Sequence, residues 1–120
     1  MDAATVEDAL REFVARATSR ARHRIRSIIL YGSRARGMAR PDSDVDVLVV
    51  VDHRDAALTD AIHGAALEVD LEHLTFLSVK ICPEAKLLEM RRLGDPFLAA
   101  VEGEGRVLWT RTSKAASATG

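Results

Sequence analysis

Two groups of residues suited to binding phosphate and metal lie in one short window of the sequence. Gly32 and Ser33 come directly after an apolar run, RIRSIILY. A glycine lets the backbone approach a phosphate closely, a following helix N-terminus points free N–H groups at the anion, and the serine hydroxyl adds a donor. Arg34 and Arg36 add positive charge beside them. These residues predict a phosphate cradle.

Two aspartates, Asp44 and Asp46, follow at the entrance to a valine-rich run, VDVLVVV. On an extended strand, residues i and i+2 share one face, so the two carboxylates would lie side by side. Like charges held that close repel each other unless a cation lies between them. Magnesium prefers carboxylate and phosphate oxygens. A phosphate cradle beside a two-carboxylate metal site is the arrangement that in-line phosphoryl or nucleotidyl transfer requires.

Hydrophobic periodicity and turn formers indicate which elements position these residues. Apolar residues recur at helical spacing from Thr5 to about residue 20, and Thr5 with Asp8 resembles a capping box. Runs of β-branched and apolar residues predict strands at about 24–31, 45–51 and 76–82, the second buried on both faces. The remaining expected elements are a short helix at 33–38, a helix from Asp55 or Thr59 to about His73, helices at 83–94 and from Asp95 to Gly103 or Gly105, and a last short strand, RVLW.

This alternation predicts an α/β or α+β fold, with helices flanking a small mixed β-sheet. A length of 120 residues, 48% of them hydrophobic, fits one domain with one core. We expect that domain to span residues 1–109. The segment 110–120, TRTSKAASATG, is small and polar, and it is expected to be a disordered tail.

Composition also limits the function classes. The net charge of −1 gives no support for nucleic-acid binding or for attraction to acidic membranes. No apolar run approaches the roughly 20 residues needed to cross a bilayer, and the first residues carry no signal pattern. Cys82 is the only cysteine, which fits a reducing compartment and a cytoplasmic protein.

The motif that these residues form resembles one known family. GSRARG, followed by Ser43–Asp46 entering a valine-rich strand, resembles the polymerase-beta-like nucleotidyltransferases, and in particular their small stand-alone MNT-type members. The segment GDPFLAAVEGEGRVLW, residues 94–109, is similar to the C-terminal portion of many of these small proteins. The resemblance covers roughly residues 5–109 and implies the nucleotidyltransferase fold.

The resemblance implies roles residue by residue. Gly32 and Ser33 would bind the β- and γ-phosphates of a nucleoside triphosphate, most simply ATP, and Arg36 would neutralise developing charge. Asp44 and Asp46 would hold two magnesium ions. A nucleoside monophosphate, AMP in the case of ATP, would pass to an acceptor hydroxyl, and pyrophosphate would leave. Ser43 is expected to steady the turn by hydrogen bonding.

The resemblance also implies a partner. Small proteins of this type resemble the antitoxin half of toxin–antitoxin modules, in which an all-helical HEPN toxin is the partner and supplies an acceptor tyrosine. A transferase acting on aminoglycosides ranks last, because it would need a second domain that this chain lacks, and a dimer partner would have to supply the sugar site. The sequence leaves the oligomeric state open, and a homo-oligomer is one of the possibilities.

One expected residue has no clear counterpart. Active members carry a third carboxylate on a strand beside the Asp-x-Asp strand, but the run FLSVKIC contains no Asp or Glu. Asp70, in the run LEVDLE, is the nearest candidate, and the sequence favours a helix there over a strand. The third carboxylate is therefore either Asp70 or absent. If it is absent, the chain is either a slowed enzyme or a degenerate binding module that acts on its partner by contact alone.

Overall fold

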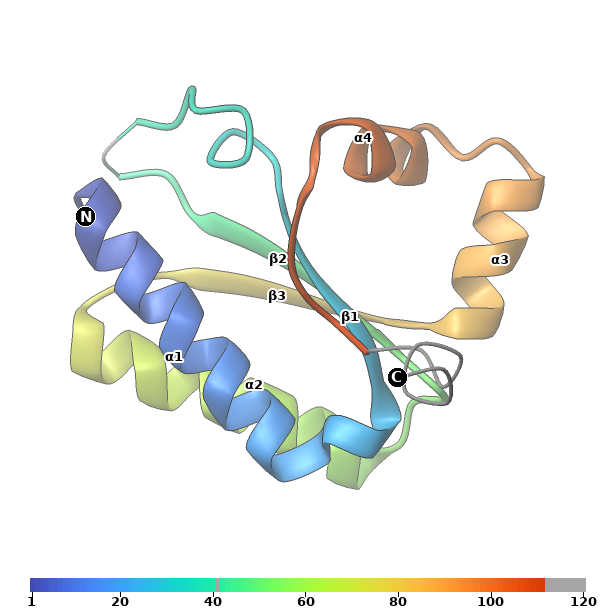
Figure 1. Cartoon of the computed structure of the whole chain (residues 1–120), viewed down its shortest axis with the longest axis horizontal. Helices are drawn as coiled ribbons and strands as arrows, with labels where there is room; N and C mark the ends of the chain where they lie inside the picture. Colours follow the sequence, from blue (N-terminus) through green and yellow to red (C-terminus); the bar gives the residue numbers. More distant parts are fainter. Residues whose placement is uncertain (41, 112–120) are drawn as a thin grey trace, which may run out of the picture.

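The computed structural model describes residues 1–40 and 42–111 of the chain, with helices on both faces of a four-stranded sheet (Figure 1). The elements are α1 (Ala3–Ala21), the 3-10 helix η1 (Arg22–Arg24), β1 (Ile25–Tyr31), β2 (Val45–Val51), α2 (Ala56–His73), β3 (Leu77–Pro83), α3 (Glu84–Arg92), α4 (Pro96–Glu104) and β4 (Arg106–Thr110). The expected mixed sheet with flanking helices is confirmed.

The sheet has the strand order β3-β2-β1-β4. β1 runs antiparallel to both β2 and β4, whereas β2 and β3 are parallel. The antiparallel pair β1–β2 is joined by the loop of residues 32–44, and the parallel pair is joined through α2, as a parallel connection requires. The loop therefore connects β1 to β2 at one end of these two adjacent, central strands.

The long helices α1 and α2 cover one face of the sheet (Figure 1). Phe13 of α1 and Ile62 of α2 are fully buried, and they belong to the same hydrophobic cluster as Val47 and Val49 of β2. The outer sides of the two helices are joined by ion pairs from Arg16 and Arg20 to glutamates of α2. This face supplies the main core.

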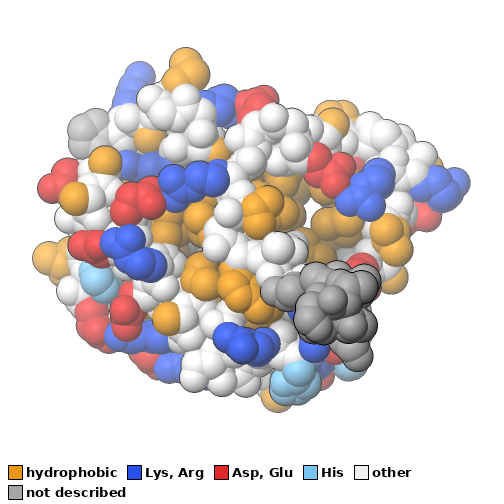
Figure 2. Space-filling view, in the orientation of Figure 1, with side chains coloured by type: hydrophobic (Ala, Val, Ile, Leu, Met, Phe, Trp, Pro, Cys, Tyr) orange, Lys and Arg blue, Asp and Glu red, His pale blue; other side chains and the backbone are white. Residues whose placement is uncertain are grey.

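The short helices α3 and α4 lie over the other face (Figure 1). They bury a smaller cluster, which consists of Leu48, Val50, Cys82, Leu87, Leu98 and Val101. β2 is consequently buried on both faces, as its valine-rich sequence predicts. Charged side chains crowd the surface over α1 and α2, whereas hydrophobic side chains show between α4 and the sheet (Figure 2).

Two local expectations are wrong. The N-cap of α1 is Asp2, whose side chain accepts a hydrogen bond from the backbone N–H of Thr5, so α1 starts before the expected capping box. Residues 33–37 form successive turns instead of a short helix. Their glycine ends, Gly32 and Gly37, both have positive φ, which interrupts helical geometry.

The C-terminal boundary also differs slightly from the expected one. Thr110 belongs to β4, and the backbone N–H of Arg111 donates to the carbonyl of Arg26 at 2.9 Å. The described structure thus includes the first two residues of the expected tail, and residues 112–120 lie outside the described residues. In the part of the chain that the structure describes, no helix has the length and apolarity to cross a bilayer.

Candidate active site

The loop after β1 brings its glycine against Asp46, one of the two aspartates. Gly32 has φ +77°, and a Cβ atom built on it would lie 2.5 Å from Oδ2 of Asp46. Both the backbone conformation and the close approach therefore require glycine. The carbonyl of Gly32 accepts the backbone N–H of Ala35 at 3.1 Å, which turns the chain back at once. The predicted phosphate cradle and the predicted metal ligands meet at this point.

Hydrogen bonds within the loop fix its far end. Nη2 of Arg34 donates to the carbonyls of Ser43 at 3.1 Å and Arg40 at 3.3 Å. The hydroxyl of Ser43 accepts the backbone N–H of Arg40 at 3.0 Å, which confirms its expected role in steadying the turn. Arg34 thus holds the loop in shape immediately before Asp44.

Asp46 occupies the centre of the site and is half-buried. It lies opposite Tyr31 of β1 and beside Ser78 of β3 in the strand register. Burial raises the pKa of the Asp46 carboxyl above its ordinary value, the charge of Asp44 raises it further, and Lys80 opposes the shift. An aspartate whose pKa is raised by a neighbouring carboxylate is typical of a functional site.

This donor set fits magnesium. Proteins commonly hold Mg²⁺ with one or two carboxylates, and substrate phosphates and water complete the coordination. Asp44 and Asp46 would supply the carboxylates, and the Gly32 turn lies against Asp46. A cation would also relieve the repulsion that raises the pKa of Asp46.

Arg36, the other arginine of the loop, pairs with the C-terminal end of α4. Its Nη1 lies 3.3 Å from Oε2 of Glu104, and both side chains are nearly half exposed. The structure therefore connects the loop to α4 through an ion pair that the sequence analysis did not anticipate. An exposed pair of this kind is worth at most about 1 kcal/mol, so Arg36 exchanges partners at little cost.

Asp70 lies in α2, and the favoured helical interpretation of LEVDLE is confirmed. Its carboxylate accepts hydrogen bonds from the Thr75 hydroxyl at 2.8 Å and from the backbone N–H of Leu77 at 3.0 Å. α2 covers the sheet face opposite to Asp46. Within residues 1–40 and 42–111, no group of three or more His, Cys, Asp or Glu side chains is placed to hold a metal. The structure thus does not bring Asp70 to the pair, and Asp70 instead fixes the turn into β3.

Sequence reasoning missed Lys80. It lies on β3, one position of the same face beyond Ser78, and its Nζ is 5.6 Å from the centroid of the Phe97 ring. Phe97 in turn meets the ring of Tyr31 edge-on, with centroids 5.3 Å apart. The alternation of FLSVKIC puts Ser78 and Lys80 on one face, and that signal was available. The contact with Phe97 of α4 was not, because it joins segments distant in the chain.

Comparisons with known proteins identify the family. The family model described as nucleotidyltransferase domain matches residues 9–97. A Methanocaldococcus jannaschii protein named "putative protein adenylyltransferase" is 50% identical over 103 residues, which are 86% of this chain and 97% of the relative.

Two solved structures share the fold. A chain from a mutant of the toxin–antitoxin pair MntA–HpeT has a TM-score of 0.56 at 13% identity, over 88% of this chain and 76% of that one. A chain from a toxin–antitoxin complex with AMP-PNP has a TM-score of 0.52 at 16% identity, over 89% and 77%. The family match and the 50% identical relative show that the chain belongs to the nucleotidyltransferase domain family and is a transferase enzyme.

Proposed function

We propose that the protein is a magnesium-dependent adenylyltransferase that moves AMP from ATP to a hydroxyl on a partner protein. The observation that carries this proposal is the contact between Gly32 and Asp46, since it joins a phosphate-binding turn to a pair of carboxylates. The Methanocaldococcus jannaschii relative is named for protein adenylylation, which supports both the AMP and the protein acceptor. The AMP-PNP complex of a structural neighbour supports ATP as the donor.

In this mechanism each residue acts where it lies. The Gly32–Ser33 turn binds the β- and γ-phosphates through backbone N–H groups and the serine hydroxyl. Asp44 and Asp46 hold two magnesium ions. When bound, these ions neutralise the triphosphate and polarise its oxygens. Arg36 releases Glu104 and adds positive charge beside the leaving group.

The transfer itself is an in-line displacement. The acceptor oxygen forms a bond to the α-phosphorus, and the bond from that phosphorus to the β-bridging oxygen breaks as pyrophosphate leaves. The hydroxyl proton passes to water or to a substrate oxygen, because no third carboxylate stands with the aspartate pair among the described residues. We expect slower turnover than a site with a carboxylate base would give.

The proposed partner is a toxin of the HEPN type, encoded beside this protein. The toxin–antitoxin names of two structural neighbours support such a pairing. The buried thiol of Cys82, which is the only cysteine, fits a cytoplasmic location. A measurement of the mass of the purified protein in solution tests whether it forms a homo-oligomer.

A second function is favoured by one observation. Because Asp70 is engaged with Thr75 and Leu77, the site has only two carboxylates, as expected of a degenerate module that inhibits its partner by contact. Such a module gains nothing from the repulsion that raises the pKa of Asp46. The transferase therefore remains the better proposal.

The test is transfer of label from α-phosphate-labelled ATP, with magnesium, to the product of the adjacent gene. The wild type is compared with the Asp44→Asn, Asp46→Asn double variant and with Asp60→Asn, a control on the exposed side of α2. Label on the partner with wild type and Asp60→Asn, but not with the double variant, is the expected result. A partner inhibited equally by all three proteins, without label, would establish the binding module instead.

A further inference from the structure

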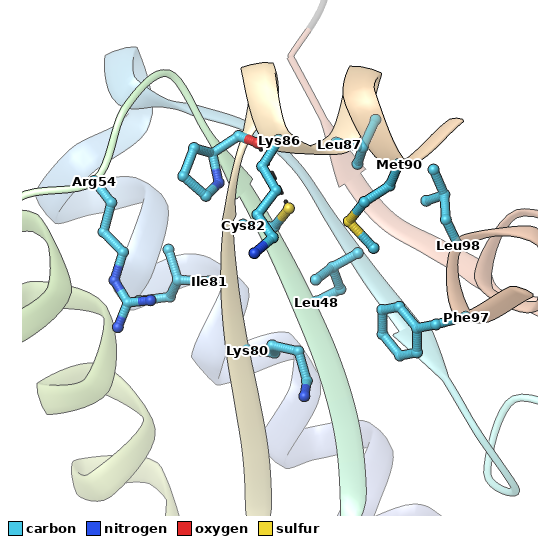
Figure 3. Close-up of a pocket in the computed structure, with 11 residues that line it drawn as sticks. Leu48, Arg54, Lys80, Ile81, Cys82, Lys86, Leu87, Met90, Phe97 and Leu98 are labelled. Carbon is cyan, nitrogen blue, oxygen red and sulfur yellow. Dashed lines mark hydrogen bonds between the residues drawn. The ribbon is translucent and has the colours of Figure 1, made fainter. Parts of the chain in front are cut away.

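A cavity of about 580 Å³ opens on the Asp46 face of the sheet, between β3, α3 and α4 (Figure 3). Its apolar lining includes Leu48 of β2, Leu87 and Met90 of α3, and Phe97 at the start of α4. The transfer mechanism described above uses none of these side chains. This β3–α3–α4 cavity is large enough for a side chain of a bound ligand.

The charged residues that line the cavity are all cationic. Arg54, Lys80 and Lys86 all line it, and no Asp or Glu is among the lining residues in the described part of the chain. The whole protein has a net charge of −1, so this local excess of cations does not reflect general composition. An apolar floor with a cationic rim is complementary to a ligand that combines an apolar group with negative charge.

The position of the cavity relative to β2 points to the acceptor. Gly32 follows β1 on one side of Asp46, whereas Lys80 lies on β3, on the other side. In an in-line displacement the attacking oxygen enters opposite the leaving group. With pyrophosphate over the Gly32 turn, the acceptor must arrive from the β3 side. Lys80 lines the cavity and lies on the same face of β3 as Ser78, the register partner of Asp46, so it connects the two places.

The strand beside the cavity favours a peptide over a nucleic acid. β3 is at the end of the strand order and, among the described strands, pairs only with β2. An edge strand presents backbone donors and acceptors that recognise an extended peptide. Nucleic acid offers no matching ladder of backbone amides, and the apolar floor does not suit its phosphates.

We propose that the β3–α3–α4 cavity is the acceptor site, and that it binds an acidic peptide segment of the partner whose apolar residue fills the floor while its hydroxyl reaches Asp46. This inference rests on the proposed function and specifies its acceptor. Lys86 and Arg54 bind the carboxylates of the segment, and Lys80 guides the acceptor toward the α-phosphorus.

The test measures binding of a labelled peptide by fluorescence anisotropy, with full-length protein and ATP–magnesium binding recorded in the same samples. The peptide carries Asp and Glu on both sides of a leucine-tyrosine-leucine centre. One comparison peptide has Asn and Gln in place of the acids, and a single-stranded RNA of similar length is the third probe. Lys86→Glu changes an exposed residue of α3, and Arg22→Glu makes the same charge change at an exposed residue of η1 that does not line the cavity.

We expect the wild type to prefer the acidic peptide over its amide counterpart. Lys86→Glu should weaken acidic-peptide binding about five- to tenfold, whereas Arg22→Glu should change it less than about twofold. As an acceptor in the transfer assay, the peptide should show a raised KM with unchanged kcat in Lys86→Glu. ATP–magnesium binding should be equal in all three proteins.

Three results would overturn the assignment: equal binding of the two peptides, equal effects of the two charge reversals, or Lys86-dependent binding of the RNA alone. If any of these occurs while the wild type still binds ATP–magnesium, the acceptor site is wrong and the proposed function stands. If the wild type binds the acidic peptide but no nucleotide, the proposed function fails and the acceptor role fails with it.

Discussion

The two faces of the sheet have the same strand, β2, in common but differ in almost everything else. Val45, Val47, Val49 and Val51 are fully buried beneath α1 and α2, which are 19 and 18 residues long. The opposite face carries Asp46 and is covered by α3 and α4, each of 9 residues. The long helices complete a core, whereas the short ones leave a cavity beside the aspartate. One face of the sheet thus contributes most of the core, and the other carries the candidate active site.

The carboxylates of the two regions differ in the same way. Hydrogen bonds from Arg20 lower the pKa of Glu68 on the α1–α2 side, and those from Arg24 lower the pKa of Asp52 at the end of β2. The pKa of Asp46 is raised, because burial and Asp44 outweigh Lys80. Carboxylates with stabilising partners serve the fold, and the carboxylate whose ionised form is disfavoured is the one that needs a cation.

The largest effect should come from a substitution on the face of the sheet that carries Asp46. Asp46→Asn removes a carboxylate that we propose to bind magnesium, at almost constant volume, and we expect the transfer rate to fall about a thousandfold, roughly 4 kcal/mol of transition-state stabilisation. Single-turnover transfer of AMP with saturating ATP measures this change. The exposed control Asp60→Asn should retain the wild-type rate. A loss smaller than about tenfold would mean that the aspartate pair is not the metal site.

The next largest effect should come from a substitution on the face of the sheet that α1 and α2 cover. Phe13→Ala empties a fully buried position between α1 and the sheet and should lower the free energy of unfolding by about 3–5 kcal/mol. Urea unfolding measures it, with exposed Arg11→Ala as a control expected within about 0.5 kcal/mol of the wild type. The fraction that remains folded should transfer AMP at the normal rate. Loss of activity in folded Phe13→Ala would show that the two faces are coupled.

Gly32→Ala combines the two regions in one residue. It places a Cβ 2.5 Å from Oδ2 of Asp46 and also strains a backbone at φ +77°. Gly94→Ala has nearly the same strain, at φ +69°, but its Cβ would meet nothing within 4 Å. Both variants should lose about 1–2 kcal/mol of stability from the backbone, and only Gly32→Ala should lose activity, by about a hundredfold. Equal activity in the two variants would contradict a role for the close approach.

The smallest effect is a gain in stability. Because the pKa of Asp46 is raised in the folded protein, the unfolded chain ionises first as the pH rises, and the wild type loses stability between the two pKa values. Without magnesium, Asp46→Asn should therefore melt about 2–5 °C higher than wild type at pH 7. The difference should vanish in acid, below the ordinary pKa of an aspartate. Melting curves at several pH values test this prediction. An Asn variant that is less stable than the wild type at pH 7 would contradict the raised pKa of Asp46.

Much of this division could be read from the sequence. The bounds of β2 coincide with the run VDVLVVV, because a valine-rich strand buried on both faces has few alternatives. The predicted turn at Gly32 does lie against Asp46, since local sequence determines both segments, and their roles in binding phosphate and metal stay predictions. The helix containing Asp70 was favoured correctly for the same reason.

The rest depends on contacts between distant segments. The contact of Lys80 with Phe97 and the pairing of Arg36 with Glu104 require α4 to fold back over the sheet. Local sequence patterns do not indicate how α4 packs against the sheet. The start of α1 was missed because Asp2 and Thr5 both suit an N-cap, and only the structure shows that Asp2 caps the helix.

The most direct test of the two-face account follows the backbone amide signals of labelled protein by NMR as AMP-PNP and magnesium are added. We predict large shifts for Gly32, Ser33, Asp44 and Asp46, smaller ones for Ser78 and Lys80, and none for the buried residues of α1. Shifts that cluster instead around Arg22, His23 and Trp109, at the far end of β1, or no shifts at all, would contradict the assignment of this site to nucleotide binding.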